Sequence, residues 1–275
     1  MEVAGKTILI TGANTGIGRT TALALARQGA TLVLAGRSEA RHAGVLSELS
    51  ACGTSATFLP LDLGNLASVR ACAQRFLASG APLHMLVNNA GLAGARGQTG
   101  DGFELAFGVN HLGPFLLTEL LLERIKASAP SRIVNVSSVG HYRAKPLDWD
   151  ALRRPTSSVT GLPEYNTSKL CNVLHAKELA TRLAGSDVTT YSLHPGTIAS
   201  DIWREVPWGL RHLMRLAMRS TEQGAATTLH CATSDEAGAE TGLYYEDCRP
   251  KPPSAFAMDA ALGITLRTRS EAWVN

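Results

Sequence analysis

The sequence predicts an α/β protein built around one doubly wound parallel sheet of about seven strands, with helices on both faces. Two observations predict this class. Short apolar runs, each suited to a buried strand, alternate along 275 residues with longer segments of helical periodicity. The first apolar run leads directly into a glycine-rich turn and then an alanine-rich helix. This arrangement is of the Rossmann type.

The elements can be placed in chain order. Strands are expected at residues 6–11, 31–36, 55–60, 83–88, 131–137 and 188–194, with a weaker strand near 241–245. Segments long enough for crossover helices separate most of these runs, including residues 39–51, 65–79 and 163–184. No repeat, low-complexity tract or linker divides the chain, so we expect a single domain over residues 1–275.

The glycine turn after the first expected strand reads Thr11-Gly12-Ala13-Asn14-Thr15-Gly16-Ile17-Gly18. Glycine lets the backbone turn at positive φ and approach a ligand without a Cβ in the way. Free N–H groups and the positive dipole end of the next helix attract an anion. The turn therefore predicts a pyrophosphate site formed by Gly12, Asn14, Thr15, Gly16, Ile17 and Gly18. The alternative is a glycine-rich turn in another kind of α/β protein, which the flanking strand and helix disfavour.

The end of the second expected strand indicates which dinucleotide binds. A carboxylate there accepts hydrogen bonds from the ribose of NAD, whereas an arginine accommodates the 2′-phosphate of NADP. This strand ends in Gly36-Arg37, and a guanidinium can hold a phosphate through two parallel hydrogen bonds. We therefore expect NADP(H) rather than NAD(H). The alternative is that Arg37 is an ordinary solvated charge.

Composition excludes several classes of function. The formal net charge of +3 is too small to indicate a nucleic-acid partner. Five cysteines without a CxxC pair argue against a disulfide framework or zinc site and favour the cytoplasm, and the histidines lack metal-ligand spacing. The first expected strand begins close to Met1, and no apolar run approaches the roughly 18 residues of a membrane span. We expect no metal, signal peptide or transmembrane segment.

Residues suited to binding or catalysis follow the ends of six expected strands, namely Gly12, Arg37, Asp62, Asn88, Ser138 and Pro195. In open parallel sheets, ligands bind beyond the carboxyl ends of the strands, where the strand order reverses. The sequence therefore predicts one site at this edge of the sheet.

Tyr165 and Lys169 are four positions apart, so a helix over 163–184 places both on one face. A nearby ammonium, together with the charge of an oxidised nicotinamide, is expected to lower the pKa of the phenol from its usual value near 10. Such a phenol can donate a proton to a carbonyl or accept one from an alcohol. Ser138 can bond the substrate oxygen, with Ser137 as the competing choice. Taken alone, the Tyr/Lys pair would more commonly be a chance pair on a helix surface.

From Lys6 to about Ser200 the sequence resembles the short-chain dehydrogenase/reductase family. The glycine turn is similar to the family's cofactor motif, Asp62-Leu63 to its adenine contact, and Asn88-Asn89-Ala90-Gly91 to its fourth-strand motif. The resemblance implies four catalytic residues, which are Asn110, Ser138, Tyr165 and Lys169. It also implies a turn over the nicotinamide that includes Pro195, Gly196 and Ile198.

The resemblance assigns further roles to two of these residues. Asn110 is expected to hold a water in a proton relay to Lys169, and Lys169 is also expected to contact the nicotinamide ribose. The alternative for Asn110 is that its side chain caps a helix.

The chain departs from compact members of the family between Ser138 and Tyr165, which are 27 positions apart. Residues 140–163 are therefore expected to be an insertion at the mouth of the site. With Asn166 and the run His194-Pro195-Gly196, it resembles the retinol-dehydrogenase-like branch, which implies lipophilic aldehydes, ketones or alcohols as substrates. Steroid or quinone-type carbonyl reduction is the alternative. A nucleotide-sensing, non-catalytic member of the fold would be expected to lack part of the catalytic set.

Residues 198–220 are expected to form a substrate lid, with Arg211, Arg215 and Arg219 along one side of a helix and apolar residues along another. A further hypothesis is that this lid makes weak contact with an anionic membrane surface. The alternative is an amphipathic helix packed on its own domain. The resemblance also implies a homodimer or homotetramer formed through the helices over 112–127 and 163–184.

Overall fold

The computed structural model describes residues 1–196 and 220–275. Within these ranges the strands form one eight-stranded sheet in the order β3-β2-β1-β4-β5-β6-β7-β8, parallel except for the last pair. The strands are β1 (Thr7–Thr11), β2 (Thr31–Gly36), β3 (Ala56–Pro60), β4 (Met85–Asn88), β5 (Ser131–Val136), β6 (Val188–His194), β7 (Leu243–Glu246) and β8 (Arg249–Pro250). The doubly wound parallel sheet predicted from the sequence is confirmed.

The connections between the strands are mostly helical. The long helices are α1 (Gly16–Arg27), α2 (Glu39–Ala51), α3 (Leu66–Ala78), α5 (Gly113–Ala127), α6 (Leu162–Arg182), α8 (Thr221–Thr233) and α11 (Ala260–Val274). The short ones are α4 (Leu105–Phe107), the π-helix η1 (Gly108–Leu112), the 3₁₀ helices η2 (Val139–Arg143) and η3 (Ala151–Arg153), α9 (Asp235–Gly238) and α10 (Ala255–Met258).

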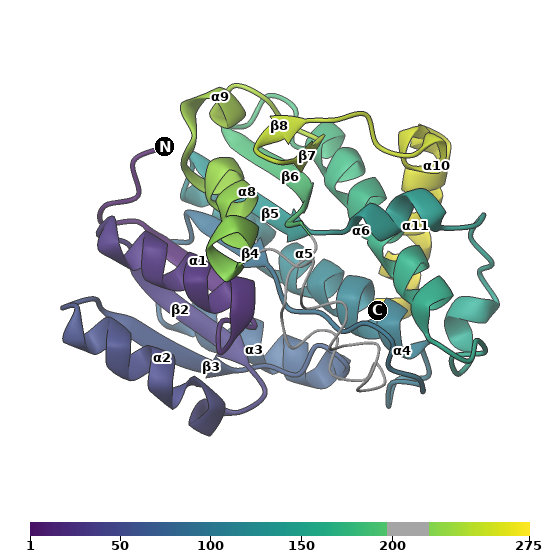
Figure 1. Ribbon diagram of the computed structural model, residues 1–275, viewed down its shortest axis with the longest axis horizontal. Helices are drawn as coiled ribbons and strands as arrows, with labels where there is room; N and C mark the ends of the chain where they lie inside the picture. The colour runs from purple at the N-terminus through teal and green to yellow at the C-terminus, as the bar shows by residue number, and fades with distance from the viewer. Residues whose placement is uncertain (197–219) are drawn as a thin grey trace.

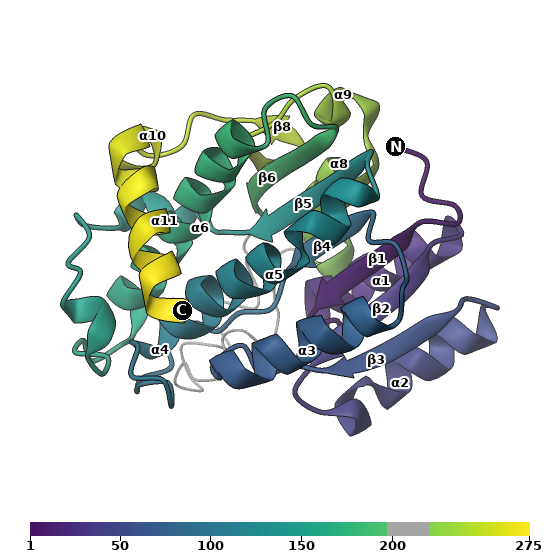
Figure 2. The same ribbon diagram turned by 180° about the vertical axis from the view of Figure 1, so that it is seen from behind.

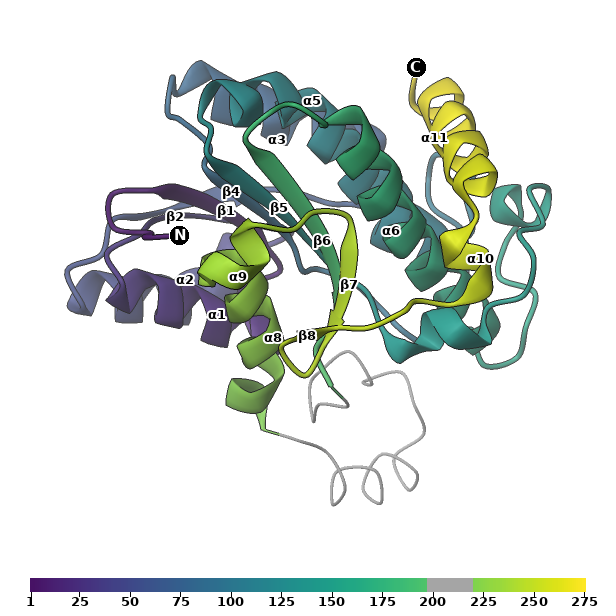
Figure 3. The same cartoon turned by 90° about the horizontal axis from the view of Figure 1, so that it is seen from above.

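The helices cover both faces of the sheet. Figures 1 and 2 show α1, α2 and α8 on one face and α3, α5 and α6 on the other, and Figure 3 shows the layers from above. Each face has its own core, because successive strand residues point to opposite sides. In β1, Leu9 packs into the core beneath α3, α5 and α6, whereas Ile8 and Ile10 pack beneath α1 and α2. Burial on both faces explains why the central strands are continuous apolar runs.

The strand order reverses at β1, which pairs with β2 on one side and β4 on the other. The chain leaves β1 through the glycine turn toward α1, and it leaves β4 toward η1 and α5 on the opposite face. These two departures open a crevice at the carboxyl edge of the sheet. The site expected from the sequence lies at this crevice.

Several elements near the C-terminus were not predicted, namely α8, α9, β8, α10 and α11. The strand expected near 241–245 is β7, and it is followed by the two-residue strand β8, which pairs with it in antiparallel fashion. The turn between them contains Asp247 and Cys248, with φ of 51° and 58°. A two-residue strand is too short to show the period of two that identifies strands in a sequence. Of the helices that were not predicted, α11 is the longest.

Helix α11 packs on the outer side of α6 and against α5 (Figure 2). With α11 in place, the exposed residues of α5 are polar or small, and the central part of α6 is buried. The expected pairing of these two helices with a second copy stays a prediction, and it would have to use polar or small residues of α5.

The stretch Leu105–Ala127 is, among the described residues, long and apolar enough to cross a membrane. This feature was missed in the sequence, where polar residues interrupt the apolar run. In the structure, 78% of its most apolar 18-residue window is buried inside the protein, as in the core helix of a globular domain.

Residues 197–219 lie outside the described part of the chain. The predictions that fall there are the cofactor contact of Ile198, the arginine stripe of residues 211–219 and all but the last residue of the lid over 198–220.

Candidate active site

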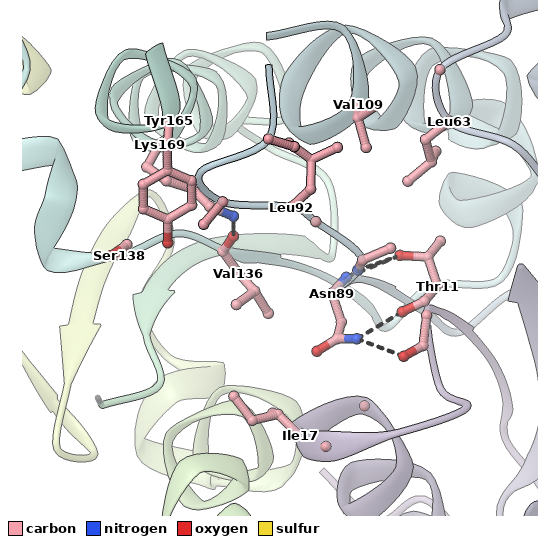
Figure 4. A pocket seen from close by; sticks show the side chains of 18 of the residues that line it. Thr11, Ile17, Leu63, Asn89, Leu92, Val109, Val136, Ser138, Tyr165 and Lys169 are labelled. Carbon is pink, nitrogen blue, oxygen red and sulfur yellow. Dashed lines mark hydrogen bonds between the residues drawn. The ribbon is translucent and has the colours of Figure 1, made fainter. Parts of the chain in front are cut away.

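A cleft of about 1550 Å³ lies at the carboxyl edge of the sheet. It is lined by residues that follow β1, β2, β3, β4, β5 and β6, and Figure 4 shows it from close by. Pockets for a single small molecule usually measure ~300–1,000 Å³. This cleft is therefore large enough for an extended nucleotide and a second molecule beside it.

The glycine turn forms one end of the cleft. Gly12 has φ of +69°, and an added Cβ would lie 2.9 Å from the Cβ of Ala90. At Gly18, an added Cβ would lie 2.6 Å from the carbonyl oxygen of Gly12. The N-cap of α1, Thr15, makes no side-chain cap bond, and the first turn carries no acidic residue. The turn therefore fits a pyrophosphate, because its N–H groups and positive dipole end meet no competing carboxylate.

The loop after β4 is locked to this turn. The hydroxyl oxygen of Thr11 accepts hydrogen bonds from the backbone N–H groups of Asn89 and Ala90, each at 3.0 Å. The side-chain amide of Asn89 donates to the carbonyl oxygens of Thr11, at 2.8 Å, and Gly12, at 3.2 Å (Figure 4). Asn89 was quoted in the family motif but not assigned a role, and the structure shows that it holds the turn in shape.

Every predicted contact of the glycine turn lines the cleft, and so do most of the other expected cofactor residues, namely Arg37, Asp62, Leu63, Ala90, Gly91, Pro195 and Gly196. Asn88 does not. Its amide donates to the Thr118 hydroxyl at 3.1 Å and to Asn135 Oδ1 at 3.0 Å, inside the protein. Asn88 therefore links β4 to α5 and β5, and its part in shaping the cofactor site is indirect.

Two arginines, Arg37 and Arg41, line the cleft at the end of β2, and both are exposed. Arg41 was missed in the sequence, although it follows Arg37 by four positions. Gly36 packs against His42, and an added Cβ at Gly36 would lie 2.4 Å from the imidazole Cε1. Any side chain at position 36 would therefore have to displace the His42 ring.

The other end of the cleft holds Tyr165, Ser138 and Lys169. Tyr165 is 6% exposed, and its hydroxyl is hydrogen-bonded to Ser138. The Lys169 ammonium donates to the carbonyl oxygen of Val136 at 2.9 Å and lies 5.6 Å from the centre of the Tyr165 ring (Figure 4). The hydroxyl of Ser137 instead donates to the Lys169 carbonyl at 2.7 Å. The geometry therefore favours Ser138 over Ser137 as the partner of the phenol.

The protein's own groups shift the two pKa values in a way that differs from the expectation. Burial raises the pKa of Tyr165, and the hydrogen bond with Ser138 lowers it by a smaller amount. Burial also lowers the pKa of Lys169 to about 8. The expected lowering of the phenol pKa relied on the ammonium together with the charge of a bound oxidised nicotinamide, and in this structure the ammonium donates to the Val136 carbonyl oxygen. Among the protein's own groups, burial is therefore the larger influence on the pKa of Tyr165.

Asn110 lies in the π-helix η1, 1% exposed, and does not line the cleft. Its Oδ1 accepts from the Leu92 N–H at 2.8 Å, and its amide donates to the Leu92 carbonyl and to the Ser168 hydroxyl, each at 2.9 Å. These bonds tie the loop after β4 to α6, so the side chain does not cap a helix. Asn110 Oδ1 and Lys169 Nζ both lie next to Gly91, at 3.1 and 3.4 Å from its ideal Cβ position.

The region 140–163 contains η2 and η3 and borders the cleft. Its Thr156 exchanges backbone and side-chain hydrogen bonds with Gly97 and donates its hydroxyl to the buried carboxylate of Glu104. Burial raises the pKa of Glu104. These contacts connect residues 140–163 to the loop that contains Gly97 and Glu104. The lining of the cleft also contains apolar side chains, namely Leu92, Leu105, Val109, Val139 and Leu162.

Among the described residues, no cluster of three or more His, Cys, Asp or Glu side chains is placed to hold a metal ion.

Comparisons with known proteins agree with this arrangement. Residues 6–147 match the model of the short chain dehydrogenase family. The chain is 45% identical over 257 residues to retinol dehydrogenase 12 of Mus musculus, covering 90% of this chain and 80% of that protein.

Solved structures share the fold. An uncharacterised protein from Mycobacterium paratuberculosis is 31% identical with a TM-score of 0.80, covering 99% of this chain and 94% of that one. A promiscuous reductase that catalyses keto-reduction in lugdunomycin biosynthesis is 25% identical with a TM-score of 0.68, covering 90% and 96%. The chain therefore belongs to the short-chain dehydrogenase/reductase family, in its retinol-dehydrogenase-like branch, and is a pyridine-nucleotide-dependent oxidoreductase acting on CH–OH groups.

Proposed function

We propose that this protein is an NADP(H)-dependent oxidoreductase that transfers a hydride between the nicotinamide and a lipophilic carbonyl or alcohol. The observation that supports this most is the placement of Tyr165, Ser138 and Lys169 in the same cleft as the glycine turn. A nucleotide anchored at the turn and extended along the cleft reaches the phenol at the other end.

The side chains suggest how the proton moves. A bound nicotinamide supplies the hydride for reduction and accepts it in oxidation. In reduction, the Tyr165 hydroxyl donates its proton to the carbonyl oxygen, while the Ser138 hydroxyl stabilises the charge that grows on that oxygen. Hydride and proton together convert the carbonyl to an alcohol. The Lys169 ammonium stabilises the phenolate that remains.

Reprotonation of Tyr165 is proposed to run through Lys169 and a water held by Asn110. The positions of Asn110 Oδ1 and Lys169 Nζ, both next to Gly91, support this relay. Asn110 has one Oδ1 lone pair engaged by Leu92, so a second is available to a water.

The preference for NADP(H) is proposed from the basic edge of the cleft. Arg37 and Arg41 offer two guanidinium groups to a 2′-phosphate, and Gly36 provides no carboxylate of the kind that would favour NAD(H).

The apolar side chains in the lining of the cleft support a lipophilic substrate, and the name of the mouse relative points to a retinoid alcohol or aldehyde. The alternative is a steroid or quinone-type ketone, which the keto-reducing neighbour favours.

We also propose one domain over residues 1–275, a lid over 198–220 and a cytoplasmic location. The five unpaired cysteines support that location.

The test is the substitution Tyr165→Phe. It removes the proton donor and keeps the ring, so reduction of a retinaldehyde, steroid ketone and quinone panel should fall by about 10²–10⁴-fold. NADPH affinity, measured by quenching of protein fluorescence, should stay within about twofold because the phenol oxygen contributes little to nucleotide binding. Retained turnover would contradict the mechanism. A wild-type protein that binds NADPH but reduces no carbonyl and oxidises no alcohol would instead support the non-catalytic alternative.

A further inference from the structure

A buried histidine connects Ser138 to the C-terminal part of the chain. His141 lies in η2, fully buried, with its ring 4.6 Å from that of Tyr244 in β7. Its Nδ1 is 2.7 Å from the carbonyl oxygen of Ser138, and its Nε2 is 3.2 Å from the backbone N–H nitrogen of Ser254, 113 residues further along the chain.

These two partners determine the protonation state of the ring. The Ser138 carbonyl can only accept a hydrogen bond, so Nδ1 must carry a proton. The Ser254 N–H can only donate, so Nε2 must be free of one. His141 is therefore neutral, with its proton on Nδ1. Burial lowers the pKa of His141, which agrees with this state.

The bond to Ser138 affects the side chain that faces the substrate. The Ser138 carbonyl also accepts from the His141 backbone N–H at 3.1 Å, and the Ser138 Oγ accepts from the Gly140 N–H at 3.1 Å. The same Oγ is bonded to the Tyr165 hydroxyl. The imidazole thus holds the peptide group next to the hydroxyl, and rotation of that peptide would turn Oγ away from the phenol.

We propose that His141 is a positioning residue: as its Nδ1–H tautomer it holds the Ser138 peptide so that the hydroxyl faces Tyr165, and through Nε2 it couples this geometry to the segment before α10. The inference rests on the proposed function, because it takes Ser138 to act on the substrate oxygen.

Two substitutions separate the two bonds. In His141→Asn the side-chain amide nitrogen can take the place of Nδ1, so the bond to Ser138 can be kept while the bond to Ser254 is lost. In His141→Gln the side-chain amide lies near the place of Nε2, so the bond to Ser254 can be kept while the bond to Ser138 is lost. We expect His141→Gln to lower kcat by about tenfold, the effect of losing one buried hydrogen bond, and His141→Asn to stay within about threefold of the wild type.

The KM for the carbonyl and the Kd for NADPH should change by less than about twofold in both variants, because the Ser138 contact strengthens only as charge develops. The matched control is Tyr142→Phe. The Tyr142 hydroxyl donates to the Pro252 carbonyl at 2.7 Å and so joins the same two segments without touching Ser138. Equal loss of kcat in Tyr142→Phe and His141→Gln, or in His141→Gln and His141→Asn, would overturn the proposal.

A second measurement does not need turnover. Long-range ¹H–¹⁵N NMR spectra of the ring nitrogens, assigned by the signal missing in His141→Asn, should show Nδ1 protonated and Nε2 unprotonated at pH 7. A proton on Nε2 overturns the positioning role even if the enzyme is active. If Nδ1 is protonated but the protein turns over no substrate, the proposed function is wrong. The hydrogen-bonded bridge between the two segments would still be present.

Discussion

At the scale of single residues, two arginines at the end of β2 provide a test of cofactor choice. In Arg37→Asp a carboxylate replaces a guanidinium at the edge of the cleft, where it would repel a phosphate. A charge-assisted hydrogen bond contributes about 1.5–3 kcal/mol, so kcat/KM for NADPH should fall by roughly 10- to 150-fold. The kcat/KM for NADH should change only a few-fold, because NADH has no 2′-phosphate.

Steady-state kinetics with both nucleotides would measure this effect, and Arg41→Asp should act in the same direction. Arg75→Asp, an exposed charge on α3 away from the cleft, is the control for a general loss of positive charge. Equal loss for NADPH and NADH in Arg37→Asp would contradict the assignment of NADP(H).

At the scale of elements, α11 covers part of the surface of α6, the helix that carries Tyr165 and Lys169. Leu266 of α11 is 1% exposed, and Arg267 pairs with Glu178 of α6, with 2.7 Å between Nε and Oε1. Arg182 of α6 binds Glu119 of α5 through two bonds of 2.7 and 2.9 Å. Because α11 covers the apolar residues of α6, we expect the wild-type protein to be monomeric by light scattering coupled to size-exclusion chromatography.

Leu266→Asp tests the same surface. A carboxylate in that apolar contact should detach α11, lower the free energy of unfolding by about 3 kcal/mol or more, and produce self-association through α6. Ile264→Asp is the matched control, because Ile264 lies on the same helix and is 52% exposed. A wild-type dimer, or a monomeric and fully stable Leu266→Asp protein, would show that α11 does not cover an association surface.

At the scale of the whole molecule, two buried histidines make stability depend on pH. His111 in η1 and His175 in α6 are buried in the core with ring centres 6.0 Å apart, and burial lowers the pKa of each to about 3. In the unfolded chain each titrates near 6.5. Between these values the unfolded state binds more protons, so the free energy of unfolding decreases as the pH falls from about 6.5 toward 3.

The free energy of unfolding should decrease by about 2 kcal/mol per histidine between pH 7 and pH 5. Urea unfolding at both pH values would measure it. His175→Phe should remove about half of the decrease, because phenylalanine fills a similar space and does not titrate. An unchanged decrease in that variant would assign the acid sensitivity to other groups, such as His141.

Much of the fold and part of the site followed from local patterns in the sequence. The sheet, the glycine turn and the shared face of Tyr165 and Lys169 depend on periods of two to four residues, which the chain displays directly. The two-residue strand β8 and the helix α11 were missed, because neither has a strong local signal.

The tertiary structure decided what depends on residues far apart in the chain. Asn88 and Asn110 proved to be bonded within the protein rather than to line the cleft, and burial rather than the Lys169 charge sets the direction of the Tyr165 pKa. The bond between His141 and Ser254 spans 113 residues. By itself the sequence determined the order of the elements and the kinds of side chain at their ends. Packing determined each side chain's partners and exposure to water, because hydrogen bonding and desolvation depend on distances that only the folded chain defines.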